Sequence, residues 1–205
     1  MKTKILSVFP ACGKTWVYEH QKELGISVLD SDSSQFSWMY IKRTPEAEEI
    51  EELKGYWGQE FKKLMTWEEY TNMIKEDTIK VRNPEFPDNY IEYIKEQLEF
   101  DKYDYIFVSS HESVRKALND AGIDFTVVFP KRKLKNEWVG RCYLRENNGF
   151  PLSVLVDNWD KWIDQMHLEI RSGHRYKKLK SNQYLSDVLF DSKQNKLLSK
   201  GILKL

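Results

Sequence analysis

Hydrophobic and polar positions divide the chain into two kinds of segment. Short apolar runs, typical of buried strands, alternate with longer segments whose apolar residues recur every three or four positions, as in helices. The pattern predicts five strands at residues 4–9, 26–29, 103–108, 123–129 and 176–180, the last lysine-rich like an exposed edge strand. It also predicts helices at 16–24, 88–98, 112–120 and 152–170. This alternation favours one α/β domain over residues 1–205, with a parallel sheet.

Residues 42–82 break this alternation. Thr44-Pro45-Glu46 resembles a helix start with proline in the first turn, and Thr66 with Glu69 resembles a capping box. We expect two or three helices here, forming an inserted subdomain. It is either an acceptor-binding arm that closes over substrate or simple helical decoration. Arg82, at its end, either holds an acceptor phosphate or forms a surface ion pair of little energetic weight.

The first strand leads directly into Pro10-Ala11-Cys12-Gly13-Lys14-Thr15 and then into a helix. Strand, tight loop, Gly-Lys-Thr and helix are the context of a phosphate-binding loop. Unpaired N–H groups at the helix start attract an anion, lysine adds a positive charge, and a threonine hydroxyl can bind Mg²⁺. The motif G-x-P-G-x-G-K-[ST] is imperfect here, because Val8 and Ala11 replace its first two glycines. Ala11 is expected to be strained if its position requires a positive φ.

Two acidic residues, Asp30 and Asp32, follow the second strand. Ligands of open α/β sheets bind beyond the carboxyl ends of the strands, so these carboxylates are candidates for the acceptor and, in the case of Asp30, for Mg²⁺. The alternative is that one of them caps the next helix, since aspartate and serine are favoured caps.

The segment after the fourth strand is basic. A helix predicted within residues 131–150 carries Arg141 and Arg145 on one face, four residues apart. By analogy with small kinases, which carry their lid after the fourth strand, we expect this segment to form a lid. Two guanidiniums there would suit the oxygens of a transferring phosphoryl group. The alternative is a solvent-facing helix with pairs such as Glu137 to Arg141. Asn182, in the loop after the fifth strand, is a further nucleotide-binding candidate.

The third strand ends at Ser109, where motor-type ATPases usually place a Mg²⁺-binding aspartate. Its absence points toward the kinase branch of phosphate-loop proteins. His111 is a weaker candidate for contact with an acceptor, because a histidine near a helix start more often forms local hydrogen bonds.

The charge balance and the cysteine content indicate which partners and which cellular compartment to expect. The 32 basic and 32 acidic residues cancel, which does not favour a nucleic-acid partner, although a local basic groove is compatible with one. The two distant cysteines form no disulfide framework and predict a reducing, cytoplasmic setting. No apolar stretch approaches the length of a membrane span, so no membrane partner is expected.

The order of these elements resembles that of the P-loop nucleoside and nucleoside-monophosphate kinases, including adenylate-kinase-like enzymes and shikimate kinase. Phe-Pro-Ala-Cys-Gly-Lys-Thr and Leu-Asp-Ser-Asp-Ser are also similar to motifs of small, phage-type P-loop proteins. The resemblance implies a three-layer α/β/α sandwich with a five-stranded parallel sheet, a helical insertion and a lid. It also implies that Gly13, Lys14 and Thr15 bind ATP phosphates and Mg²⁺, with Pro10, Ala11 and Cys12 completing the loop.

The same resemblance implies that Asp32 and Asp30 orient an acceptor hydroxyl or a metal-bound water, and that Arg141 and Arg145 are lid arginines. We therefore expect an ATP-dependent phosphotransferase that acts on a nucleoside, a nucleoside monophosphate or a related small acceptor. Two alternatives stay open. One is a regulatory nucleotide-binding protein without significant turnover, and the other is a kinase of polynucleotide ends or modified DNA bases. The sequence does not determine the oligomeric state.

Overall fold

The computed structural model describes residues 3–42, 78–144 and 152–190. Five parallel strands form its main sheet, in the order β2-β5-β1-β6-β7. They are β1 (Lys4–Val8), β2 (Val28–Asp30), β5 (Tyr105–Ser109), β6 (Phe125–Pro130) and β7 (Arg175–Leu179). The predicted α/β class and the five parallel strands are therefore confirmed, with β7 at an edge as expected.

Helices connect these strands. They are α1 (Lys14–Glu19), α2 (Ser34–Ser37), α6 (Asp88–Phe100), α7 (Glu112–Asp120), α8 (Lys135–Tyr143), α9 (Leu152–Arg171) and α10 (Ser186–Leu189), with a 3₁₀ turn at Arg132–Leu134 before α8. Helix α7 has the predicted bounds, whereas α1 is shorter than expected. It ends at Glu19, and residues 20–25 form turns. The last of these residues, Gly25, adopts a φ of 63°.

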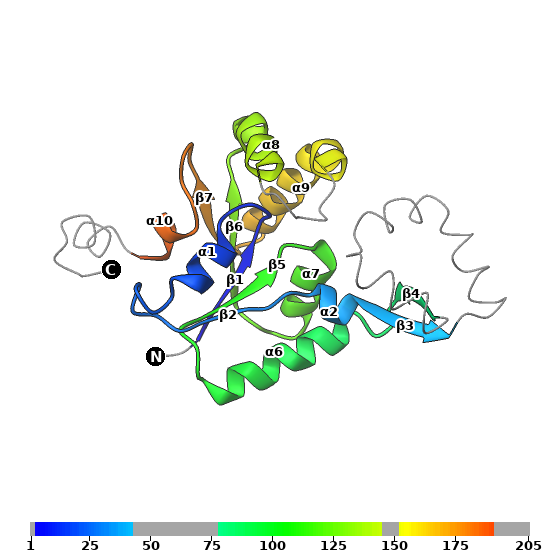
Figure 1. Ribbon diagram of the computed structural model, residues 1–205. Helices are drawn as coiled ribbons and strands as arrows, with labels where there is room; N and C mark the ends of the chain where they lie inside the picture. Colours follow the sequence, from blue (N-terminus) through cyan, green and yellow to red (C-terminus); the bar gives the residue numbers. More distant parts are fainter. Residues whose placement is uncertain (1–2, 43–77, 145–151, 191–205) are drawn as a thin grey trace.

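The helices lie on both faces of the sheet. The connection from β1 to β2 runs in one direction across the sheet, whereas those from β2 to β5, β5 to β6 and β6 to β7 run in the other. Because such crossovers are right-handed, α1 lies on one face and α6, α7 and α9 lie on the other. Figure 1 shows α1 and α10 to the left of the sheet and α7 and α9 to its right.

The core anchors the segment after β1 to the helices that follow β6. Phe9 is fully buried and packs edge-on against Trp159, with ring centroids 5.5 Å apart. The buried indole N–H of Trp138 donates to the Pro10 carbonyl at 3.0 Å, and that of Trp159 donates to the Arg132 carbonyl at 3.0 Å. Both buried donors are satisfied, so α8 and α9 fix the position of the loop that leaves β1.

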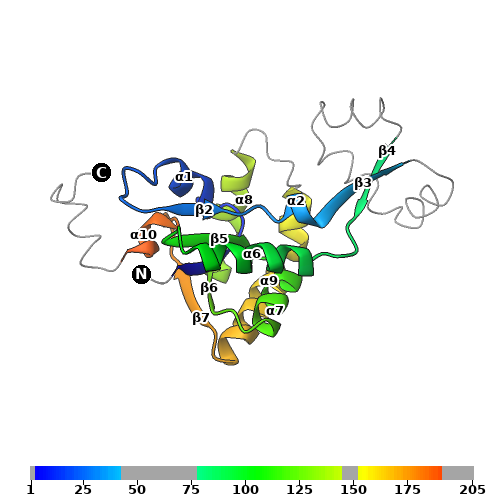
Figure 2. The same cartoon turned by 90° about the horizontal axis from the view of Figure 1, so that it is seen from below.

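The described residues at the two ends of the predicted insertion, 42 and 78–82, belong to strands rather than helices. Strands β3 (Trp38–Lys42) and β4 (Thr78–Arg82) pair in an antiparallel ribbon, in which Trp38 lies opposite Arg82 and Tyr40 opposite Lys80. In Figures 1 and 2 the ribbon extends away from the main sheet, beyond α2. The helices predicted between the strands lie outside the described residues. Of the predicted lid, the structure describes residues 131–144, which include the 3₁₀ turn and α8. Arg145 lies outside the described residues.

Candidate functional site

The loop after β1 holds the backbone in an unusual conformation. Phe9 N–H donates to the Val128 carbonyl at 2.9 Å, which ends the strand pairing, and α1 starts with Val17 N–H donating to the Gly13 carbonyl at 3.2 Å. Between these points Ala11 and Gly13 adopt positive φ values of 56° and 91°. The N–H groups of Gly13, Lys14 and Thr15 donate to no residue that the structure describes. The loop therefore presents several backbone donors to an external acceptor.

The left-handed conformation of Ala11 makes a specific prediction about stability. A non-glycine residue there costs roughly 1–2 kcal/mol, whereas glycine loses about 0.5–1 kcal/mol of extra chain entropy on folding. Ala11→Gly should therefore leave the free energy of unfolding within about 1 kcal/mol of wild type. The matched control Ala117→Gly, inside α7, should destabilise the protein by about 1 kcal/mol or more. Urea unfolding tests both, and equal losses in the two variants would contradict the strained loop.

Lys14 lies beside a carboxylate of the neighbouring strand. Its Nζ is 3.4 Å from Oδ1 of Asp30, the last residue of β2. Both side chains keep about a fifth of their surface exposed, so the pair is accessible from the edge of the sheet. The structure thus brings together the two groups that the sequence placed after the first and second strands.

Asp32 forms local hydrogen bonds just before α2. Its Oδ1 accepts the Ser34 N–H at 2.9 Å and its Oδ2 accepts the Ser34 hydroxyl at 2.8 Å, the pattern that an aspartate forms with the backbone two residues on. The side chain is nevertheless exposed and lines the same cleft as Lys14 and Asp30. A local hydrogen-bonding role therefore does not remove Asp32 from the site.

These groups line a cleft of about 800 Å³ at the carboxyl edge of the sheet. Its position follows from topology. The chain leaves β1 toward β2 and leaves β5 toward β6 in opposite directions, and the crevice between such diverging connections is where open α/β sheets bind ligands. The lining side chains come from the β1 loop, the ends of β2 and β5, α7, α8 and α9; the polar and charged ones include Lys14, Thr15, Asp30, Asp32, Ser109, Ser110, His111, Lys161 and Gln165.

His111, directly before α7, has a larger part in the cleft than the sequence suggested. Part of its side chain reaches solvent, but crowding by neighbouring atoms lowers its pKa below the ordinary value. The cations Arg82, Arg115 and Lys14 lower the pKa of His111 further, and Asp32 opposes them. A neutral imidazole among several cations is suited to accept a hydrogen bond. His111 follows β5, the strand that pairs with β1, and this position could have identified it from the sequence as a stronger candidate for the site.

Helix α9 supplies a wall of the cleft that sequence reasoning did not assign. Lys161, Trp162 and Gln165 face it from one side of the helix. No local motif marks these residues, because only the packing of α9 against β1 and α7 brings them to the site. Gln165 also donates to Glu112 of α7 at 2.5 Å, which ties the two helices together beside the cleft.

Cys12 of the loop is buried, and its thiol is expected to be unreactive. Burial raises the pKa of its thiol to about 12, although Arg141, the Trp138 indole and Lys14 act in the opposite direction. The thiol is therefore protonated at neutral pH, where the thiolate is the reactive form. We expect iodoacetamide to modify Cys142, which is half-buried, faster than Cys12 at pH 7. Peptide mapping measures this, and preferential labelling of Cys12 would contradict the protonated thiol.

Arg141 does not lie among the residues that line the cleft. Its guanidinium stacks between the rings of Trp138 and Tyr184, at 3.9 and 4.0 Å from their centroids. It donates to Glu137 at 2.6 Å and to the Gln183 carbonyl at 2.9 Å. The Glu137 pair is the alternative that the spacing left open. Arg141 thus joins α8 to the segment after β7, and its catalytic role stays a prediction.

Two other predicted residues lie outside the cleft lining. Asn182 adopts a φ of 58°, and its N–H donates to Glu137 at 2.9 Å. Burial alone would raise the pKa of Glu137, but the hydrogen bonds from Asn182, Ser181 and Arg141 lower it below the ordinary value. Arg82 stacks over the Trp38 ring, 4.0 Å from its centroid, on the ribbon.

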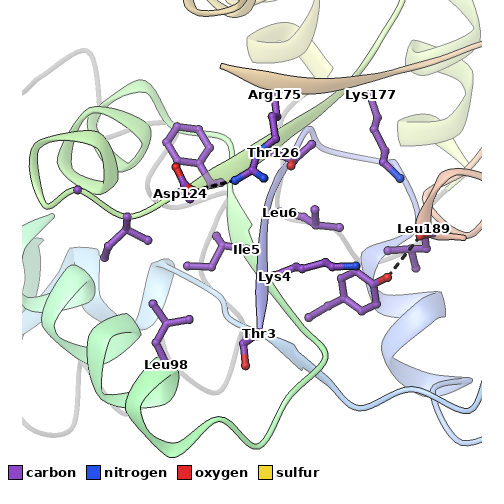
Figure 3. Close-up of a pocket in the computed structure, with 14 residues that line it drawn as sticks. Thr3, Lys4, Ile5, Leu6, Leu98, Asp124, Thr126, Arg175, Lys177 and Leu189 are labelled. Carbon is purple, nitrogen blue, oxygen red and sulfur yellow. Dashed lines mark hydrogen bonds and ion pairs between the residues drawn. The ribbon is translucent and has the colours of Figure 1, made fainter. Parts of the chain in front are cut away.

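A second cavity, of about 520 Å³, lies at the opposite, amino-terminal edge of the sheet (Figure 3). Lys4 and Lys177 line it, and Arg175 pairs there with Asp124 at 3.0 Å. Burial lowers the pKa of Lys177, and the neighbouring charge of Lys4 lowers it further. This cavity shares no residue with the cleft at the carboxyl edge, so it is separate from the loop and the aspartates.

No protein-family model, curated protein or solved structure matches this chain. Among the described helices, none combines the length and the apolar character needed to cross a membrane. The described residues also contain no group of three or more His, Cys, Asp or Glu side chains placed to bind a metal ion. The function is therefore inferred from the geometry of the cleft.

Proposed function

We propose that this protein is an ATP-dependent phosphotransferase with a P-loop kinase-type three-layer sandwich, acting on a nucleoside, a nucleoside monophosphate or a related small acceptor. The observation that supports this proposal most strongly is the 3.4 Å contact between Lys14 Nζ and Asp30 Oδ1. It lies at the carboxyl edge of the sheet, beside the loop N–H groups that donate to no described residue. A cation, backbone donors and a nearby carboxylate are the groups that phosphoryl transfer uses to hold and neutralise phosphates.

The loop is chemically suited to a triphosphate. The N–H groups of Gly13, Lys14 and Thr15 would donate to phosphate oxygens, and the Lys14 ammonium would approach the outer phosphates. The Thr15 hydroxyl and the Asp30 carboxylate fit Mg²⁺, which commonly takes few protein ligands together with substrate phosphates and water. When bound, Mg²⁺ would supply charge neutralisation at the phosphate oxygens.

The acceptor would enter from the side of Asp32. That carboxylate is exposed, lines the cleft and is held in place by its two hydrogen bonds to Ser34. A fixed carboxylate there can orient an acceptor hydroxyl and accept its proton. His111 and Gln165 line the same cleft and offer further polar contacts. Cys12 and Cys142 form no disulfide in the part of the chain that the structure describes, which fits a protein that works in the cytoplasm.

Measurement of ATP consumption against panels of nucleosides, monophosphates and oligonucleotides tests this proposal. Acceptor-dependent formation of ADP together with a phosphorylated acceptor is the expected result. Tight binding of ATP without turnover on any acceptor would indicate a regulatory nucleotide-binding protein instead. Absence of both ATP binding and turnover would overturn the proposal.

A further inference from the structure

The outer ribbon carries cations and aromatic rings on one face. Trp38 and Tyr40 alternate along β3, and they lie directly opposite Arg82 and Lys80 of β4. Since side chains two apart on a strand, and those directly opposite across a pair, share a face, these four side chains form one surface. We call these four residues together with Lys42 the ribbon face. Neither strand contains an acidic residue.

The contacts within the ribbon face are close. The Arg82 guanidinium lies 4.0 Å from the centroid of the Trp38 ring, and the Lys80 ammonium lies 5.9 Å from Trp38 and 5.7 Å from Tyr40. Tyr40 keeps 47% of its surface exposed, and Lys42 and Arg82 are exposed. No described residue supplies a carboxylate to Arg82. The exposed cations Lys42 and Arg82 therefore lie on the same face as the exposed ring of Tyr40 and the half-buried ring of Trp38.

We propose that the ribbon face binds single-stranded nucleic acid. Aromatic rings alternating with cations provide stacking surfaces for bases and counter-charges for phosphates, the two contacts that unpaired strands use. Bases in a duplex are stacked on one another and cannot reach such rings. The net charge of zero for the whole chain does not oppose this, because the charge of the ribbon face is local.

The ribbon face also adjoins the cleft. Helix α2 leads directly from Asp32 and Ser34, which line the cleft, into β3, and the Asn83 N–H that follows β4 donates to the Ser37 carbonyl at 3.1 Å. A strand held on the ribbon face would therefore present one of its nucleotides to Asp32. This last step depends on the proposed function and names its acceptor as a nucleotide within a polynucleotide. Binding to the ribbon face does not depend on it.

Fluorescence anisotropy with labelled oligomers of about 12 nucleotides tests the binding directly. We expect the full chain to bind oligothymidine or oligouridine, and to bind a duplex of the same length at least tenfold more weakly. The DNA and RNA arms show which sugar is preferred. If Lys42, Lys80 and Arg82 each contact one phosphate, the logarithm of the binding constant should fall with the logarithm of salt concentration with a slope of roughly −2.

Substitutions at two positions of the ribbon face, Tyr40 and Lys80, assign the binding to it. Tyr40→Ala should weaken single-strand binding about tenfold, while Tyr40→Phe retains the ring and should bind like wild type. The matched control Phe100→Ala removes an exposed ring from α6 and should have no effect. Lys80→Ala should reduce the salt slope by about 0.7, whereas Lys95→Ala, which removes an exposed cation from α6, should leave it unchanged.

The outcomes separate this inference from the proposed function. Single-strand binding that survives Lys14→Ala, and is weakened about tenfold in Tyr40→Ala while ATP binding is retained, supports the ribbon face alone. If oligonucleotides bind and are not phosphorylated, the proposed acceptor is wrong but the binding surface stands. Failure of wild type to bind either single strand at about 50 mM salt would overturn the inference, as would binding that Tyr40→Ala leaves unchanged.

Discussion

Lys14→Ala is expected to weaken binding of Mg-ATP by about one to two orders of magnitude and to abolish detectable turnover. The ammonium is the only cation of the loop and lies in the cleft within 3.4 Å of Asp30, where it would approach the outer phosphates. Loss of a charge-assisted hydrogen bond is worth about 1.5–3 kcal/mol, or roughly 10- to 150-fold in affinity. A larger loss is expected in turnover, because charge on the transferring phosphoryl group is also left unneutralised.

The fold of this variant should be intact. Lys14 and Asp30 are both partly exposed, and such pairs contribute about 0–1 kcal/mol to stability. Lys22→Ala, which removes an exposed cation just after α1, is the matched control and should behave as wild type in calorimetry and turnover. Unchanged ATP affinity and turnover in Lys14→Ala would exclude this loop as the phosphate site.

Asp32→Asn is expected to slow phosphoryl transfer by roughly 10²- to 10⁴-fold, the range typical of a group that accepts or orients a proton. The asparagine carbonyl can still accept the Ser34 N–H that Asp32 accepts at 2.9 Å, so the start of α2 should keep its geometry. Nucleotide affinity should stay within a few-fold of wild type. Turnover with the true acceptor and calorimetry with ATP measure the two effects.

A second substitution separates the two roles of Asp32. Asp32→Ala removes both hydrogen bonds to Ser34 and should add a loss of stability of about 1 kcal/mol to the loss of rate. Near-normal turnover in Asp32→Asn, with destabilisation only in Asp32→Ala, would assign Asp32 to the helix start alone. The acceptor site would then have to be sought elsewhere in the cleft.

The sequence predicted the main sheet well because each central strand is a continuous apolar run. Val8, Phe107 and Val128 are almost fully buried in neighbouring strands, and such burial leaves little choice of residue. The strained Ala11 was also predictable, because it replaces a glycine of the motif. The placement of Asp30 near Lys14 followed from the rule that loops at the carboxyl ends of parallel strands meet.

The ribbon was missed because its two strands are short and about 40 residues apart. Tyr40 and Lys80 are 40 residues apart in the chain. The apolar run Trp38–Ile41 of β3 is short, and no hairpin turn follows it to signal that β4 is its partner. The setting of Arg141 was missed for a similar reason. Its spacing from Glu137 was visible, whereas the ring of Tyr184 comes from a distant segment.

Hydrogen exchange of the backbone amides with and without Mg-ATP tests the central claim most directly. Gly13, Lys14 and Thr15 donate to no described residue in the free protein, so their amides should gain protection when phosphates accept from them. We expect protection to be concentrated on this loop and to be absent in Lys14→Ala. Unchanged exchange at the loop under saturating nucleotide, or protection confined to the amino-edge cavity around Lys4 and Lys177, would contradict it.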